Sequence, residues 1–230
     1  MTPEEINKVL EIPSWDTYSA VKSEEAAFIY DFLKEKKLTK TLEIGFAFAK
    51  SASHIIAATN SHHIACDPFQ DHYKAMGLRN IEKLGLKDKL EFIPDFSHNV
   101  LPAFVKEKRK FDFIFIDGDH KFDGILVDFY YADLLLNANG YVLLHDTWMR
   151  STRLVEKFIK TNRTDYKFAK TSLRNFSLFQ KVGTDARNGM FFREFYTPRS
   201  LLVHNLIMWM TNGKTSPVKK LLFKIKDAVK

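Results

Sequence analysis

Short apolar runs alternate with amphipathic segments from residue 41 onward. The apolar runs have the length and composition of buried strands, and they cover residues 41–45, 63–67, 89–94, 111–117 and 141–146. The segments between them repeat apolar residues at helical spacing, over about 51–59, 72–84, 100–107 and 122–136. Strands that alternate with helices in this way predict a parallel sheet with crossover helices on both of its faces.

Two more apolar runs follow a helix that we predict for about 151–161. They cover 166–171 and 176–182, and the turn-prone residues 172–175 join them, so we predict an antiparallel hairpin that closes the sheet. This arrangement suits a doubly wound sheet of seven strands, whose ligand lies at the carboxyl ends of the strands. Before the sheet, residues 23–36 predict a helix capped by Ser23, and Thr2 is expected to cap a helix at the start of the sequence.

Acidic or polar residues stand at the end of almost every predicted strand. Unpaired carboxylates at a buried strand end are costly, so several of them at one edge predict a ligand or a metal. Asp67 comes 24 residues after Glu43, close to the spacing of ~20 at which an acid binds ribose hydroxyls. The full set is Glu43, Asp67, Asp95, Asp117, His145 and Asp146.

The turn in LEIGFAFAKSASH, residues 42–54, carries a single glycine, Gly45. A pyrophosphate-binding turn needs further glycines at positive φ, where alanine costs roughly 1 kcal/mol or more. We therefore predict that Ala47 and Ala49 keep negative φ. The ligand expected beside such a turn contains a ribose but no pyrophosphate.

The motifs LEIG, CDPFQ, PDFSHNVLP and FDFIFIDGDHKFDGILVDFYYADLLLNANGYVLLHDTW occur in this order. Together they resemble a class I S-adenosylmethionine-dependent methyltransferase. More narrowly, they resemble the small-molecule O-methyltransferase group that includes the macrolide-sugar and catechol types, over about residues 20–182. The resemblance implies a Rossmann-like sheet with strand order 3-2-1-4-5-7-6 and an antiparallel last strand. It also implies methylation of a hydroxyl on a small molecule or saccharide.

The resemblance further implies which residues bind S-adenosylmethionine. Gly45 and the backbone through Ala47 would approach the methionine part, Asp67 would bind the ribose hydroxyls, and Asp95 with Phe96 would lie beside the adenine. This donor is a sulfonium cation without phosphates, so it gains more from carboxylates than from an anion-binding turn. The complete expected set is Glu43, Gly45, Phe46, Ala47, Ser51, Asp67, Pro68, Asp95, Phe96 and Asp117.

The IDGDH and HDTW motifs imply a metal and a base. In metal-dependent relatives, acids at these two strand ends hold magnesium, and Asp117 and Asp146 match that pattern. His145 stands where such relatives often carry a second acid, and an imidazole there favours a softer divalent ion over Mg²⁺, or no metal at all. His120, three residues after Asp117, is the expected general base, and a metal would acidify a weakly acidic alcohol.

The net charge of +7 is concentrated near the end of the sequence. Residues 214–230 carry six lysines and one aspartate, or +5, which leaves +2 for residues 1–213. The body therefore lacks the basic character of a nucleic-acid-binding surface. Apolar residues of the basic segment fall on one helical face and predict an amphipathic helix; they are Val218, Leu221, Leu222, Ile225 and Val229.

We divide the chain into a domain at 1–183, with a helical cap at 1–40, and a basic helical extension at 184–230. The extension is expected either to contact an anionic membrane surface or to pack on its own domain or a second copy of the chain, which leaves a homo-oligomer open. A single cysteine, the lack of a secretory pattern and the lack of an apolar run of about 20 residues predict a cytoplasmic protein.

Three functions remain open on the sequence. The leading one is O-methylation of a small molecule or saccharide. Methylation of RNA is a second, although the expected basic body and aromatic stacking platform are not evident. A third is a catalytically silent protein of the same fold that serves as a binding or membrane-associated module, which the low glycine content and His145 keep open.

Overall fold

The computed structural model describes residues 1–195 and residue 206. The chain divides into two units, Met1–Met190 and Phe191–Lys230. The first unit is described completely, and the second only at residues 191–195 and 206. The basic amphipathic helix predicted from Val218 to Val229 lies outside the described residues. No helix in the described part is long and apolar enough to cross a bilayer.

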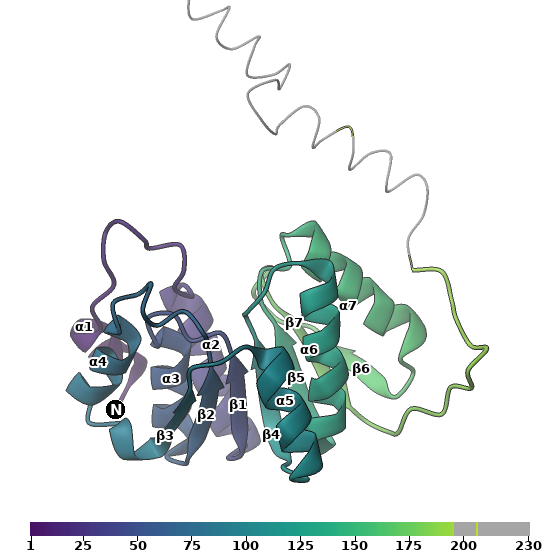
Figure 1. The fold of residues 1–230 in the computed structure, drawn as a ribbon, viewed down its shortest axis with the longest axis horizontal. Coiled ribbons are helices and arrows are strands. Elements are labelled where there is room, and N and C mark those ends of the chain that lie inside the picture. Colours follow the sequence, from purple (N-terminus) through teal and green to yellow (C-terminus); the bar gives the residue numbers. More distant parts are fainter. Residues whose placement is uncertain (196–205, 207–230) are drawn as a thin grey trace, which may run out of the picture. The chain divides into compact units, whose positions relative to one another are not determined.

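Seven strands form one sheet in the first unit, in the order β3-β2-β1-β4-β5-β7-β6 (Figure 1). All pairings are parallel except those of β7, which runs antiparallel to both β5 and β6. The predicted Rossmann-like sheet, its strand order and its antiparallel last strand are confirmed. The strands are β1 Thr41–Ile44, β2 His63–Cys66, β3 Leu90–Ile93, β4 Phe111–Ile116, β5 Leu136–Leu144, β6 Tyr166–Ala169 and β7 Ser177–Lys181.

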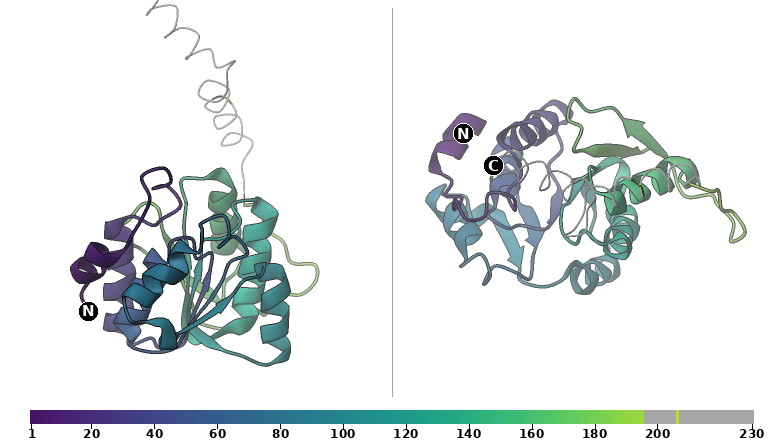
Figure 2. Two further views of the ribbon diagram at one scale, coloured as in Figure 1. Left: turned by 60° about the vertical axis from the view of Figure 1, so that its left-hand side comes forward. Right: turned by 90° about the horizontal axis from the view of Figure 1, so that it is seen from above.

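Helices cover both faces of this sheet, as Figure 2 shows from two directions. One face packs on α5, α6 and α7, and the other on α2 and α3, because alternate residues of each strand point to opposite faces. Thus Ile114 of β4 joins the first core, and Phe113 joins the second. The helices are α1 Pro3–Val9, α2 Ser23–Lys36, α3 Lys50–Thr59, α4 Met76–Lys83, α5 Ser97–Lys106, α6 Phe122–Leu135 and α7 Arg150–Asn162, with a short 3₁₀ helix η1 at Lys87–Lys89.

The caps of the first two helices differ in one respect from the prediction. Thr2 caps α1 as expected, since its Oγ1 accepts the Glu5 N–H at 3.3 Å. Ser23, however, is the first residue of α2, and Lys22 occupies the cap position. The Glu25 carboxylate accepts the Lys22 N–H at 2.8 Å, and the Ser23 hydroxyl instead accepts a hydrogen bond from the Lys50 ammonium at 3.0 Å.

Candidate active site

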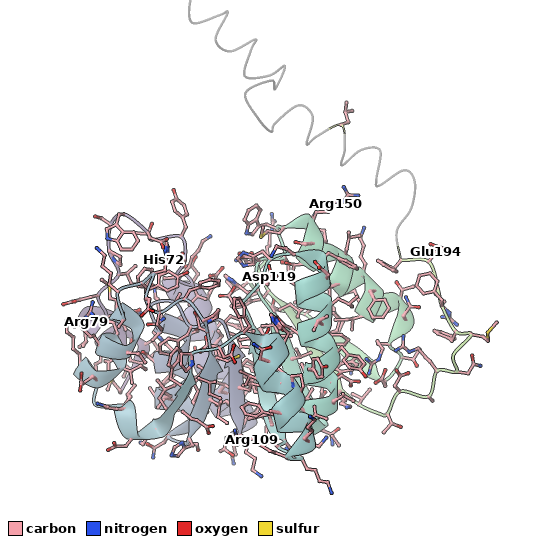
Figure 3. All side chains as sticks on the ribbon, viewed as in Figure 1. His72, Arg79, Arg109, Asp119, Arg150 and Glu194 are labelled. Atoms are coloured by element: carbon pink, nitrogen blue, oxygen red, sulfur yellow. The ribbon has the colours of Figure 1, made fainter. Side chains whose placement is uncertain are left out.

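A cavity of about 880 Å³ opens at the carboxyl ends of β1, β2, β4 and β5. Its volume is that of a small-molecule site. Figure 3 labels Asp119 at this end of the sheet and Arg109 at the opposite end. The predicted site residues that line the cavity are Gly45, Phe46, Ala47, Ser51, Asp67, Pro68, Phe96, Asp117, His120, His145 and Asp146.

The turn after β1 is held by side chains from the turn after β2. The Asp67 Oδ2 atom accepts the N–H groups of Phe46 and Ala47, at 2.8 and 2.9 Å. The Gln70 amide donates to the Ala47 carbonyl at 2.7 Å. The conformation of this turn therefore depends on two side chains that follow the next strand.

Our prediction of negative φ for the two alanines of this turn is wrong. Ala47 has φ of 42° and Ala49 has φ of 61°, both in the left-handed region. This conformation costs alanine roughly 1–2 kcal/mol, so it is stable only where surrounding interactions offset that cost. At Ala47, Asp67 stabilises this conformation by accepting two consecutive N–H groups with one oxygen, and the Ala49 N–H donates to the Phe46 carbonyl at 2.7 Å.

Asp67 itself lines the cavity and is buried. Its second oxygen, Oδ1, accepts the Phe69 N–H at 2.7 Å. A carboxylate offers about four lone-pair positions, and three are used by these backbone groups. One position remains for a ligand hydroxyl, which keeps the predicted ribose contact compatible with the geometry.

Glu43 is not among the residues that line the cavity, so its predicted role in cofactor binding stays a prediction. The side chain is fully buried between β1, β2 and α3, where it accepts hydrogen bonds from the Ser51 hydroxyl and from His63 at 3.1 Å. Burial raises the pKa of the Glu43 carboxyl in spite of these partners. Glu43 thus ties the framework of the site together.

Asp95 is not among the residues that line the cavity, although its neighbour Phe96 is, so its place beside the adenine stays a prediction. The exposed carboxylate accepts the Phe96 N–H at 2.7 Å and the Asn99 side-chain amide at 2.8 Å. These bonds fix the connection just before α5, although no side chain caps the helix itself. Phe96, the adjacent residue, does line the cavity.

Asp117, His120 and Asp146 bring their polar atoms together at the ends of β4 and β5. His120 Nε2 lies 3.0 Å from Asp146 Oδ2 and 3.8 Å from Asp117 Oδ1. One ligand atom from each of the three residues lies within 4.8 Å of the others. The carboxylates of Asp117 and Asp146 raise the pKa of His120 to about 10, so the ring is protonated at neutral pH.

His145 is engaged on both sides of its ring, and among the described residues it is not part of the group that could hold a metal. Nδ1 lies 2.8 Å from Asp117 Oδ1, and Nε2 lies 3.2 Å from Glu25 Oε2 of α2. Burial lowers the pKa of His145, but the carboxylates of Asp117 and Glu25 outweigh it and raise the pKa to about 10. A ring that donates from both nitrogens has no lone pair for a metal.

Sequence reasoning missed Glu25 and Asn175, which support this cluster from distant parts of the chain. Asn175, in the β6–β7 turn, donates to Glu25 Oε1 at 3.0 Å. Burial raises the pKa of Glu25, but hydrogen bonds from His145 and from the Lys22 N–H lower it to about 2. In the sequence, Glu25 was recognisable only as an acid in the first turn of a predicted helix. A role in capping that helix was enough to explain it there.

We compared the sequence and the structure with known proteins. Residues 42–147, from β1 to the end of the acidic cluster, match a family described as a methyltransferase domain. Residues 42–147 therefore carry a methyltransferase domain, and the sheet has the strand order that the resemblance to class I methyltransferases implies. No curated protein matches the sequence significantly.

Solved structures share the fold of this methyltransferase domain at low sequence identity. The O-methyltransferase TomG from Streptomyces achromogenes, in complex with S-adenosylmethionine, is 15% identical with a TM-score of 0.65, over 78% of this chain and 90% of that one. An O-methyltransferase from Bacillus cereus, in complex with S-adenosylhomocysteine, is 18% identical with a TM-score of 0.58, over 79% and 90%. Cofactor-bound Rv0187 from MTB is 16% identical with a TM-score of 0.62, over 78% and 87%.

Asp67→Ala in the methyltransferase domain is expected to weaken S-adenosylhomocysteine binding roughly 100-fold or more. The change removes the carboxylate that we predict to accept the ribose hydroxyls, and it frees the two amides that this carboxylate holds. Asp67→Asn keeps an oxygen that can accept the two amide N–H groups, so its affinity for S-adenosylhomocysteine should fall only roughly tenfold. Isothermal titration calorimetry measures both, with Asp71→Asn, an exposed acid on the same connection, as the control. An unchanged affinity in Asp67→Ala would contradict the assignment.

Proposed function

We propose that this methyltransferase domain transfers a methyl group from S-adenosylmethionine to a hydroxyl of a small molecule or saccharide. The observation that carries the proposal is one cavity that joins the Gly45–Ala47 turn to the cluster of Asp117, His120 and Asp146. The acceptor assignment is supported by TomG and the Bacillus cereus protein, which are described as O-methyltransferases.

The reaction requires an acceptor oxygen in line with the methyl–sulfur bond. The hydroxyl oxygen forms a bond to the methyl carbon, the carbon–sulfur bond breaks, and its electron pair returns to sulfur, which leaves as a neutral thioether. The cavity would accelerate the reaction by holding the donor and the acceptor hydroxyl in this alignment. The hydroxyl proton must also leave, and the polar cluster at the ends of β4 and β5 is the place where it can be received.

Lys50 offers a charge for the methionine end of the donor. The ammonium lines the cavity, is buried next to the turn after β1, and donates to the Ser23 hydroxyl at 3.0 Å. Burial lowers the pKa of this lysine, although nearby Glu24 and Glu25 oppose the change. A donor carboxylate placed there would pair with a cation that is otherwise poorly compensated.

The donor set of Asp117, His120 and Asp146 fits a divalent metal. Two carboxylates and one imidazole suit Mn²⁺, Fe²⁺ or Zn²⁺ better than Mg²⁺, which prefers oxygen alone. When bound there, such an ion would lower the pKa of an acceptor hydroxyl. The Nε2 atom of His120 would then be a ligand, so it cannot accept the hydroxyl proton at the same time.

Manganese titration tests the metal part of this proposal. We expect 1:1 binding of Mn²⁺ that weakens at least ~tenfold in Asp146→Asn, because the variant removes one anionic ligand. Asp123→Asn removes an exposed acid from the same cavity wall and should bind Mn²⁺ as the wild type does. If the wild type binds no Mn²⁺, the metal part of the proposal is wrong, and the proton must then leave through the carboxylates of this cluster, because His120 is already protonated at neutral pH.

Formation of S-adenosylhomocysteine tests the transfer itself. Wild-type protein is incubated with S-adenosylmethionine and with catechol or methyl glucoside as model acceptors, with and without EDTA. We expect turnover with one of these hydroxyl classes and its loss on chelation. Tight S-adenosylhomocysteine binding without turnover on either acceptor would favour the silent binding module over the enzyme.

A further inference from the structure

An exposed tryptophan lies beside the polar cluster at the ends of β4 and β5. Trp148 belongs to the connection between β5 and α7, at the edge of the sheet that carries the cavity (Figure 1). Of its surface, 68% is exposed, although tryptophan is highly buried on average in proteins. Tryptophan rings that stay open to water are common where a protein contacts a partner or a ligand. Trp148 is therefore a candidate ligand contact.

A hydrogen bond holds the Trp148 ring against the cluster. Its indole N–H donates to Asp146 Oδ1 at 2.9 Å, while the other oxygen of that carboxylate lies 3.0 Å from His120 Nε2. Asp146 lines the cavity, so the indole stands at the cavity rim with most of its surface open to water. A side chain that is already held in place loses less conformational entropy when a ligand binds to it.

The strand order separates Trp148 from the expected donor contacts. Gly45 and Asp67, which we expect to contact the donor, follow β1 and β2. Asp117 follows β4, and Asp146 and Trp148 follow β5. Because these strands lie in the order β2-β1-β4-β5, the polar cluster lies between the donor positions and Trp148. An acceptor whose hydroxyl reaches the cluster therefore has the donor on one side and the indole on the other.

The exposure of this rim favours one class of acceptor ring. A ring that stacks on a largely exposed indole keeps its edges in water, so it must be apolar on one face and hydrophilic at its edges. A pyranose has C–H groups on one face and hydroxyls around its edge, whereas a catechol would leave an apolar face in water. Exposed polar side chains that line the same cavity can exchange hydrogen bonds with sugar hydroxyls; they are Asp119, Lys121 and Asp123.

We infer that Trp148 is a specificity residue for the acceptor: its indole stacks on the C–H face of a pyranose ring and so presents a ring hydroxyl to the polar cluster. This inference rests on the proposed function, because it requires a hydroxyl acceptor beside the donor. It narrows the acceptor from hydroxyl compounds in general to saccharides.

The indole N–H signals in the NMR spectrum test the contact directly. The chain has three tryptophans, and Trp148→Phe removes one signal and so assigns it. Methyl glucoside, catechol and sorbitol, an acyclic polyol, are each titrated into wild type that is saturated with S-adenosylhomocysteine. We expect a saturable shift of the Trp148 signal with methyl glucoside, at an affinity at least roughly fivefold higher than for sorbitol or catechol, because only the pyranose offers both a C–H face and a hydroxylated edge.

Kinetics separate stacking from the hydrogen bond to Asp146. Trp148→Ala should raise the KM for methyl glucoside roughly tenfold and leave kcat nearly unchanged, because stacking holds the acceptor equally before and during transfer. Trp148→Phe loses the N–H but keeps a flat ring, so its KM should stay within ~threefold of wild type. Tyr130→Ala removes a ring that is 58% exposed on α6 and is not among the cavity residues, and it should behave as wild type.

The outcomes distinguish the inference from the proposed function. Absence of S-adenosylhomocysteine binding would overturn both. If this ligand binds, an unshifted Trp148 signal with methyl glucoside, or a stronger response to sorbitol or catechol, would overturn the inference alone. A loss of kcat in both Trp148 variants without a rise in KM would also overturn it, because the residue would then act through Asp146. A Trp148 shift without any turnover would support the contact and contradict the transfer.

Discussion

Gly45→Ala is expected to destabilise the protein by roughly 3–5 kcal/mol and to abolish S-adenosylhomocysteine binding. An added Cβ would lie 2.2 Å from the Asp117 carbonyl oxygen and 2.7 Å from its carbonyl carbon. Both are backbone atoms, so no side chain can move aside. The φ of +92° adds a conformational cost for any residue with a Cβ. The ends of β1 and β4 must therefore separate, and the cavity lies between them.

Gly85→Ala isolates the conformational part of this effect. Gly85 also has a positive φ, of +67°, but an added Cβ meets no atom within 4 Å. We expect that variant to lose only about 1 kcal/mol and to bind S-adenosylhomocysteine normally. Urea unfolding of both variants measures the difference. A cost for Gly45→Ala no greater than that for Gly85→Ala would show that the close approach to Asp117 is wrong.

His145→Gln is expected to cost roughly 3–5 kcal/mol near neutral pH, because it leaves Asp117 and Glu25 without the cation between them. This cost should depend on pH. The pKa of His145 is raised from 6.5 to about 10 in the folded protein, so its stabilisation is fully present below about pH 6.5. It is lost as the pH rises through about 10.

Thermal unfolding in EDTA from about pH 6 to pH 10 measures this dependence. The melting temperature of wild type should exceed that of His145→Gln by roughly 10 °C at the acidic end, and the gap should narrow toward the alkaline end. Lysines and tyrosines titrate in both proteins, so their effect cancels in the difference between the two melting temperatures. His62→Gln, an exposed histidine, should show no gap. A gap that stays constant with pH would contradict the proposed ion pairs.

The sheet and the end of it that carries the cavity could be predicted because both depend on local patterns. Apolar runs of strand length alternate with helical periodicity, and short connections leave few orders for the strands. Residues that follow strands, such as Asp67, Asp117 and Asp146, then fall at one edge without any knowledge of packing. This is why so many of the predicted residues line one cavity.

The errors came from contacts between residues that are distant in sequence. The positive φ of Ala47 is stabilised by the Asp67 carboxylate, which belongs to the next strand–helix connection. His145 could not be distinguished from a metal ligand because its partner Glu25 lies 120 positions away. Asp128 sits in the middle of a helix, where an acid ordinarily faces water, and only packing against α5 turns it into a cavity residue.

The contact between Glu25 and His145 has a consequence for how the domain can be divided. A shortened protein that starts at Thr41 would keep every strand of the sheet and every strand-end acid. It would nevertheless lose Glu25, and with it one of the three carboxylates that pair with the His145 ring. Helix α2, which precedes the sheet, therefore does more than cover one face of it, because it supplies a charged partner to His145. Exchanging it between relatives would alter the charge balance of the cluster at the ends of β4 and β5, even where the sheet itself is unchanged.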